Sequence, residues 1–190
     1  MIILLQSNQL GQNIQLTTYK PHLLLINKHM IKALVSDFSR VILSPADENY
    51  VGGLNALHRN LSGLGDYNFW EYFRLNEDLL AFYQTIREQI PVYVFTSEYI
   101  QEHPALQPKM QGIFKYIFSA ARLGLKKNDT ETYKIIAEKI NLKPEEILYI
   151  DDNKKNLDAS NEAGMTVIHY ESNDQVKKDV INILKKLFQN

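Results

Sequence analysis

The chain has 190 residues, 45% of them hydrophobic, and a formal net charge of -1. This length and composition suit one domain whose core is large enough to fold without disulfides or a structural metal. The absence of cysteine excludes disulfide bonds, thiol catalysis and zinc–thiolate sites. The near-neutral charge argues against a nucleic-acid surface. No apolar run reaches the ~18 residues of a membrane helix, and the opening MIILLQSNQ lacks a basic segment, so we expect a cytoplasmic protein.

Residues 1–29 differ from the rest of the chain. They are rich in Gln, Asn and Leu without a clean hydrophobic period, whereas the stretch MIKALVSDF from Met30 resembles the beginning of a domain. Two interpretations stay open: a genuine N-terminal extension, with a strand around residues 19–27, or a segment added by an upstream start codon. The predicted domain is therefore residues 30–190.

The predicted elements of this domain begin with a strand at residues 31–36, an apolar run that ends at Asp37. Residues 44–73, rich in aromatic side chains, are predicted to form a short helical cap insert. Asn76 is a suitable N-cap for the next helix, in which apolar residues recur at i, i+3, i+4 and i+7. Pro91 ends that helix because proline cannot continue it.

A second strand is predicted at residues 92–95, and it ends at Thr96 and Ser97. A third follows at residues 114–118. Asp129 is suited to cap the next helix, which again carries one apolar stripe.

The fourth and fifth predicted strands are residues 147–150 and 166–169, and the fourth ends at Asp151 and Asp152. An amphipathic helix around Val176 closes the chain. Strands that alternate with helices indicate an α/β fold, a Rossmann-like parallel sheet covered by helices on both faces.

Polar side chains stand at the ends of three predicted strands. In open parallel sheets, ligands bind outside the carboxyl ends of the strands. We therefore expect convergence of five residues: Asp37, Thr96, Ser97, Asp151 and Asp152.

Four local patterns resemble motifs of the haloacid dehalogenase (HAD) superfamily, in the order that the family uses. ALVSDFSRVIL is similar to motif I with its nucleophilic Asp, and VYVFTSE to motif II. SAARLGLKKND is similar to the segment that delivers the motif III Lys, and ILYIDDNKKN to the acidic motif IV. Each pattern alone is weak, because an Asp after an apolar strand is common. Four in order, from about Lys32 to Tyr170, identify the chain as similar to the phosphatase-like branch.

The resemblance implies a role for each motif residue. Asp37 would attack phosphorus and form an aspartyl-phosphate, and Lys127 would neutralise the phosphoryl group. Mg²⁺ would be held by Asp37, Asp151 and Asp152 and by the backbone carbonyl of Ser39, an oxygen set that this ion favours. By family geometry, Asp152 is the more direct of the two motif IV ligands.

The remaining motif residues would contact the substrate. Thr96, the adjacent backbone N–H and Ser97 would hold phosphate oxygens, and Ser39 would lie beside them. Arg40 stands where the family usually has Gly, and two interpretations are open: a surface Arg in a flap, or an added cation that faces an anionic substrate.

Ser39 is the main departure from the family, whose phosphatases carry a second Asp there. That Asp protonates the leaving group and then activates water, and losing such an acid–base costs ~10²–10⁴-fold in rate. The sequence thus predicts Mg²⁺-dependent phosphate-ester hydrolysis with weak turnover. The alternative is a catalytically silent domain that binds metal and a phosphorylated ligand or partner protein.

Two other branches also lack the second Asp. Haloacid dehalogenases need no metal, so the Asp151–Asp152 pair argues against them. Phosphonate hydrolases rely on a cap lysine, and residues 41–96 contain none. The small insert leaves the site open, which suits a phosphorylated small molecule, a larger phosphorylated substrate, a covering partner protein or a homodimer.

Overall fold

The computed structural model describes residues 30–188, with side chains through residue 185. The strand expected around residues 19–27 lies outside this range. Within it, five parallel strands form one sheet in the order β5-β4-β1-β6-β7. The strands are β1 (Ala33–Ser36), β4 (Val92–Thr96), β5 (Tyr116–Ser119), β6 (Ile147–Asp151) and β7 (Thr166–His169).

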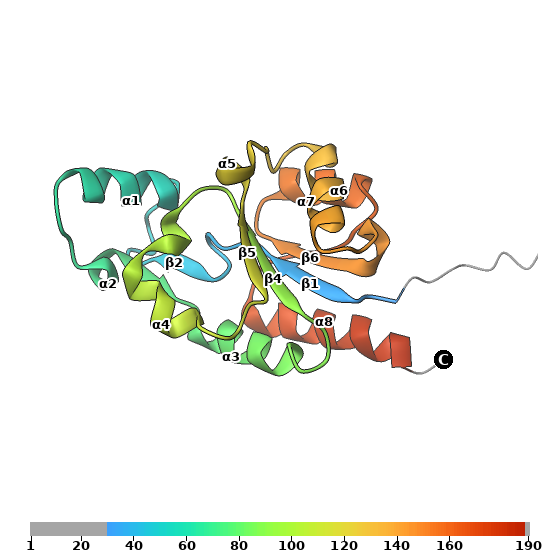
Figure 1. Cartoon of the computed structure of the whole chain (residues 1–190). Helices are drawn as coiled ribbons and strands as arrows, with labels where there is room; N and C mark the ends of the chain where they lie inside the picture. The colour runs from blue at the N-terminus through green and yellow to red at the C-terminus, as the bar shows by residue number, and fades with distance from the viewer. Residues whose placement is uncertain (1–29, 189–190) are drawn as a thin grey trace, which may run out of the picture.

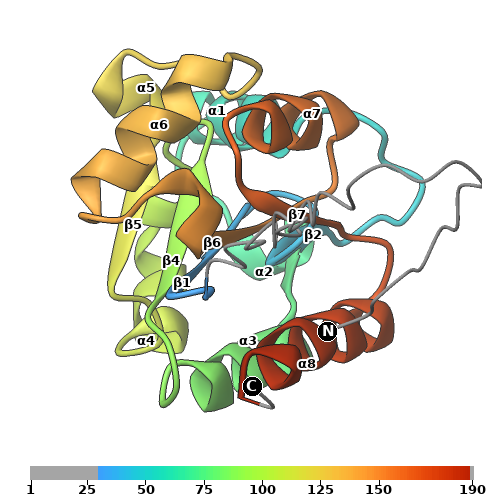
Figure 2. The ribbon, with the colours of Figure 1, turned by 90° about the vertical axis from the view of Figure 1, so that its right-hand side faces the viewer.

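Helices cover both faces of this sheet (Figures 1 and 2). One face carries α5 (Ala120–Leu123), α6 (Thr130–Lys139) and α7 (Lys154–Glu162), and the other carries α3 (Glu77–Ile86) and α8 (Asn173–Phe188). Successive β1 residues point to opposite faces, so Leu34 packs in one core while Ala33 and Val35 pack in the other. The predicted α/β, Rossmann-like fold is confirmed.

Side-chain caps set the beginnings of two sheet-covering helices. The Asn76 carboxamide oxygen accepts a hydrogen bond from the Leu79 N–H at the start of α3. The Asp129 carboxylate accepts one from the Glu131 N–H at the start of α6. Both predicted N-caps are confirmed, and each satisfies a backbone donor that the helix itself cannot pair.

The segment between β1 and β4 contains an antiparallel pair, β2 (Leu43–Pro45) with β3 (Phe73–Leu75), and the helices α1 (Leu54–Gly63) and α2 (Phe69–Tyr72). Figure 1 shows α1 and α2 beside the sheet rather than on either face. Phe69 and Phe73 stack with ring centroids 4.6 Å apart, and both belong to the buried cluster that also contains Leu34 of β1. These aromatic side chains therefore pack the insert onto the domain.

The insert is also joined to the loop after β4. The Arg59 guanidinium pairs with the Glu98 carboxylate, and the Ile100 N–H donates to the Asn55 side chain at 3.2 Å. That loop continues through η1 (Ile100–Glu102), η2 (Pro104–Leu106) and α4 (Gln107–Met110), which the sequence pattern did not predict. The insert thus contacts the chain immediately beyond Thr96.

Two strands begin two residues later than predicted, and three strands end one residue later. β1 begins at Ala33, and the N–H of the preceding Lys32 donates to the Glu146 carbonyl of the short helix η3 (Pro144–Glu146) at 2.7 Å. β5 begins at Tyr116, after an irregular approach through Phe114. Among the described residues, no helix has the length and apolar character required to cross a membrane.

Candidate active site

Three carboxylates meet at the carboxyl ends of β1 and β6. These strands are neighbours in register, with Ser36 opposite Ile150, and the Asp37 N–H donates to the Ile150 carbonyl at 2.7 Å. Asp37 therefore lies beside Asp151 and Asp152. Each of the three offers a carboxylate oxygen, and these atoms lie within 4.8 Å of one another. A compact set of carboxylate oxygens suits a hard divalent cation such as Mg²⁺.

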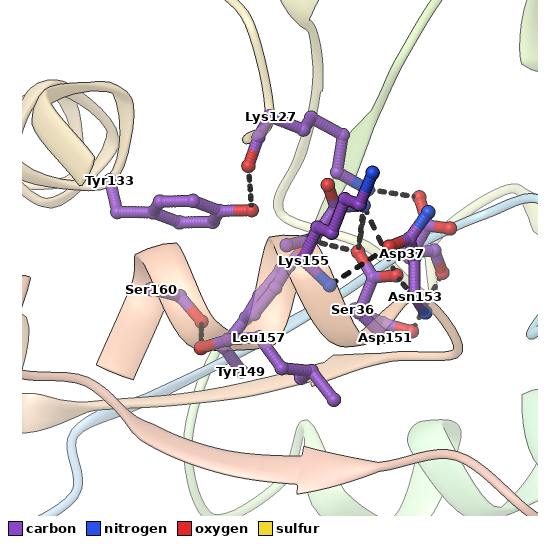
Figure 3. Close-up of polar contacts among 11 residues, drawn as sticks. Ser36, Asp37, Lys127, Tyr133, Tyr149, Asp151, Asn153, Lys155, Leu157 and Ser160 are labelled. Carbon is purple, nitrogen blue, oxygen red and sulfur yellow. Dashed lines mark hydrogen bonds and ion pairs between the residues drawn. The ribbon is translucent and has the colours of Figure 1, made fainter. Parts of the chain in front are cut away.

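Lys127 reaches this cluster from the loop between α5 and α6. Its Nζ lies 2.5 Å from Asp37 Oδ1 and 2.8 Å from Asp151 Oδ2, and all three side chains are buried. Figure 3 shows the lysine side chain directed at both carboxylates. The Tyr133 hydroxyl donates to the Lys127 carbonyl at 2.6 Å and so fixes the backbone from which this side chain extends. The structure thus brings Lys127 together with the three acids.

The electrostatics of the cluster favour an added cation. Burial raises the pKa of Asp37 to about 7; the Lys127 ammonium opposes this and the Asp151 carboxylate adds to it. Burial and the charge of Asp151 likewise raise the pKa of Asp152. Burial alone would lower the pKa of Lys127, but Asp37 and Asp151 together raise it. A divalent cation would counter the mutual repulsion of the carboxylates and favour the ionised form of those that it contacts.

Asp151 differs from the other two acids because donors surround its carboxylate. Oδ2 accepts from the Tyr149 hydroxyl and from Lys127, and Oδ1 accepts from the Asn153 N–H at 2.8 Å. The Asn156 amide contributes further contacts at 3.1 and 3.3 Å. With its oxygens so engaged, Asp151 is suited to orient Lys127, while the freer carboxylates of Asp37 and Asp152 suit direct metal ligation.

Tyr149, Asn153 and Asn156 were missed in the sequence. Tyr149 is spaced two residues from Asp151, which places both side chains on the same face of β6. Asn153 caps α7 through its side chain, and Asn156 lies in the first turns of that helix. Two sequence features could have indicated these residues: the two-residue spacing between Tyr149 and Asp151 along the strand, and the N-cap position of Asn153.

Thr96 is the last residue of β4, next to β1 in the sheet. Its hydroxyl is buried and has no hydrogen-bond partner among the described residues. An unsatisfied buried hydroxyl costs about 1–3 kcal/mol, so a partner that an anionic ligand supplied would be favoured there. Ser97 is exposed, and its carbonyl accepts from the Ala121 N–H at 3.0 Å. The structure places both residues at the carboxyl end of the sheet.

Ser39 and Arg40 begin the turn after β1. The Ser39 hydroxyl is buried and also lacks a partner within the described part of the chain. The Arg40 guanidinium donates to the carbonyls of Tyr50 and Gly52 at 2.9 and 2.8 Å. It therefore holds the start of the insert, and its charge opposes the raised pKa of Asp152. That Arg40 contacts a substrate stays a prediction.

Arg40 adopts a left-handed backbone, with φ of 63°. This conformation favours glycine, which explains why the resembling family usually has Gly there. Arg40→Gly and Arg40→Ala both remove the two side-chain hydrogen bonds, but only Ala keeps the backbone strain. We expect the Gly variant to be more stable than the Ala variant by about 1 kcal/mol in urea unfolding. Equal stability of the two variants would show that the backbone carries no strain there.

Comparison of the sequence with known proteins gives one family match and a few partial relatives. Residues 3–164 match the family model of the haloacid dehalogenase-like hydrolases. The chain is 35% identical over 94 residues to Enolase-phosphatase E1 of Aquifex aeolicus. The aligned region covers 45% of this chain and 42% of that protein. The matches thus span less than half the length of the curated relatives.

Solved structures share the fold at low identity. A predicted HAD-like family hydrolase from Porphyromonas gingivalis superposes with a TM-score of 0.60 at 13% identity, covering 82% of this chain and 98% of that one. A HAD family enzyme from Bacteroides thetaiotaomicron, in complex with magnesium and inorganic phosphate, gives 0.56 at 16% identity, covering 75% and 96%. Since the family model spans most of the sequence and the fold agrees, the chain belongs to the haloacid dehalogenase-like hydrolase family.

Proposed function

We propose that this hydrolase is a Mg²⁺-dependent phosphatase that cleaves phosphate esters through an aspartyl-phosphate on Asp37. The observation that carries the proposal is the convergence of Asp37, Asp151 and Asp152 on one point, with Lys127 between two of them. The structural neighbour that holds magnesium and inorganic phosphate, and the enolase-phosphatase relative, support the same chemistry.

In the proposed first step, an Asp37 carboxylate oxygen attacks phosphorus and the bond from phosphorus to the ester oxygen breaks. Lys127 balances negative charge on the phosphoryl group, and the Thr96 hydroxyl donates to one of its oxygens. Bound Mg²⁺ would be held by Asp37, Asp152 and the Ser39 carbonyl and would supply positive charge to the phosphoryl oxygens. Water then attacks the phosphorus of the aspartyl-phosphate, the bond from phosphorus to the Asp37 oxygen breaks, and inorganic phosphate leaves the restored Asp37 carboxylate.

Ser39 limits the esters that this site would cleave. A serine hydroxyl does not deliver a proton near neutral pH, so the leaving group must depart as an anion or take its proton from water. Leaving groups that are stable as anions, such as phenolates, need no such proton. We therefore propose a preference for aryl, enol or acyl phosphates over alkyl phosphates.

Replacing Ser39 tests this account. We expect Ser39→Asp to raise the rate at which an alkyl phosphate transfers its phosphoryl group to Asp37 by ~10²–10⁴-fold and that rate for an activated aryl phosphate much less, because only the former needs the acid. Single-turnover release of the two alcohols, with Mg²⁺ and with chelator, would measure this first step apart from hydrolysis of the aspartyl-phosphate, which is common to both esters. Ser39→Asn is the matched control, because asparagine has nearly the same size as aspartate but no carboxyl group that can donate a proton. An equal gain on both esters would contradict the assigned role of this position.

The second candidate function is a catalytically silent domain that binds metal and a phosphorylated ligand or partner protein. The missing acid at Ser39 favours it. Robust Mg²⁺-dependent turnover of an aryl phosphate by the natural chain would exclude it. Binding of Mg²⁺ and inorganic phosphate without turnover, even in Ser39→Asp, would support it instead.

A further inference from the structure

A second surface feature lies away from the acidic cluster, at the open edge of the sheet. A groove of about 550 Å³ runs along β5 and the neighbouring ends of α5 and α6. None of the residues described above in the candidate active site lines it. Its floor includes Tyr116, Phe118 and Leu123, and its rim includes Lys115, Arg122 and Lys139.

The floor is a row of aromatic rings. Tyr93 of β4 stacks with Phe118 at 6.2 Å between ring centroids, and Phe118 contacts Tyr116 at 4.6 Å. The first two rings are buried, but Tyr116 is 59% exposed. A large exposed ring that continues a buried row offers apolar area to a partner.

The rim is cationic, and no acidic side chain from the described part of the chain lines the groove. Lys115 and Lys139 are exposed, and neither pairs with a carboxylate of the described residues; Lys115 lies 5.9 Å from the Tyr93 ring centroid. Arg122 is already paired with Glu102, at 2.5 Å between Nη2 and Oε2. Two lysine charges therefore remain for an anionic partner.

The backbone of β5 is available along the same groove, because within residues 30–188 β5 pairs only with β4. The Lys115 N–H donates to the Val92 carbonyl and the Ala121 N–H to the Ser97 carbonyl, so odd-numbered residues face β4. In a parallel ladder the intervening residues face the other way. Tyr116 and Phe118 thus present backbone N–H and C=O groups to the open edge, which is a template for another strand.

We propose that this groove binds an extended acidic peptide segment of a partner protein, which adds a strand to β5. Apolar side chains of the peptide would cover Tyr116, and acidic ones would pair with Lys115 and Lys139. A second copy of the chain fits poorly, because it would bring like charges together. Residues 1–29 fit poorly as well, because they contain no acidic side chain.

Labelled peptides test the proposal by fluorescence anisotropy. The probe has about eight residues in which Glu alternates with Val; a second peptide replaces each Glu with Lys. We expect the natural chain to bind the Glu peptide roughly tenfold more tightly than the Lys peptide, with weaker binding at high salt. The double variant Lys115→Glu with Lys139→Glu, at two exposed positions, should reverse that preference. Equal binding of both peptides, or a preference that the double variant leaves unchanged, would overturn the proposal.

An N-methylated peptide separates strand addition from simple charge attraction without altering the protein. Methylation of alternate amides removes the donors that would pair with the β5 edge while keeping every carboxylate. We expect one of the two methylation registers to lose binding at least about fivefold. Unchanged binding in both registers would overturn the added strand. Lysine-dependent binding of a mononucleotide, with no binding of either unmodified peptide, would instead assign the groove to a small anionic ligand and overturn the peptide proposal.

Discussion

The Asp37→Asn variant is expected to lose Mg²⁺-dependent aryl phosphatase activity by about 10⁴-fold or more. The amide is a poor nucleophile toward phosphorus, and Asp151, the carboxylate that shares Lys127 with Asp37, is occupied by several donors. The fold should persist, since Asn replaces a buried carboxylate with a neutral group of the same shape. Steady-state rates on the purified chain would measure the phosphatase activity, and circular dichroism would show whether the fold is retained.

Asp158→Asn is the matched control for this experiment. Asp158 is exposed on α7 and pairs with Lys154 at 2.9 Å, so its loss changes one charge without touching the cluster. We expect its activity to equal that of the natural chain. Activity that survives Asp37→Asn at the natural level would remove Asp37 from the mechanism.

The second large effect concerns stability. Lys127→Met removes the buried ammonium that bridges Asp37 and Asp151 while keeping a long side chain. Breaking a buried ion pair costs about 3–5 kcal/mol, because the partner charges remain buried without compensation. We expect a loss of that size in the free energy of urea unfolding without metal. Mg²⁺ should restore part of it, and should stabilise the variant more than it stabilises the natural chain.

Lys126→Met separates this effect from a general effect of changing the loop. Lys126 is the adjacent residue and is exposed, so its replacement should change the unfolding free energy by less than about 0.5 kcal/mol. If both variants lose equal stability, or if Mg²⁺ does not favour the Lys127 variant, the bridging role of Lys127 is wrong.

The three central strands of the sheet, β1, β4 and β6, could be predicted because they are buried on both faces. Such strands appear as short continuous apolar runs, and polar residues mark their ends, as at Asp37 and Asp151. Parallel topology then requires those ends to lie at one edge, which brings distant residues together without any alignment. The N-caps Asn76 and Asp129 could also be predicted from the sequence, because capping depends on a contact between a side chain and the nearby backbone.

Other features depend on contacts that leave no local pattern. The pair of β2 and β3 is too short to show a period of two, and Pro45 argues against a strand. The donors around Asp151 come from a buried tyrosine and a helical asparagine, which are ordinary residues by sequence. The anchoring of Arg40 to Tyr50 and Gly52 also needed coordinates, because the insert fold decides which carbonyls it meets.

The account depends most directly on one divalent ion bound among the carboxylates. Isothermal titration calorimetry of the chain with Mg²⁺, in phosphate-free buffer, measures this without relying on turnover. We predict one ion per chain, an affinity at least about 100-fold weaker in Asp152→Asn, and an unchanged affinity in Asp158→Asn. No measurable Mg²⁺ binding by the natural chain, or equal binding by Asp152→Asn, would contradict the proposed metal centre.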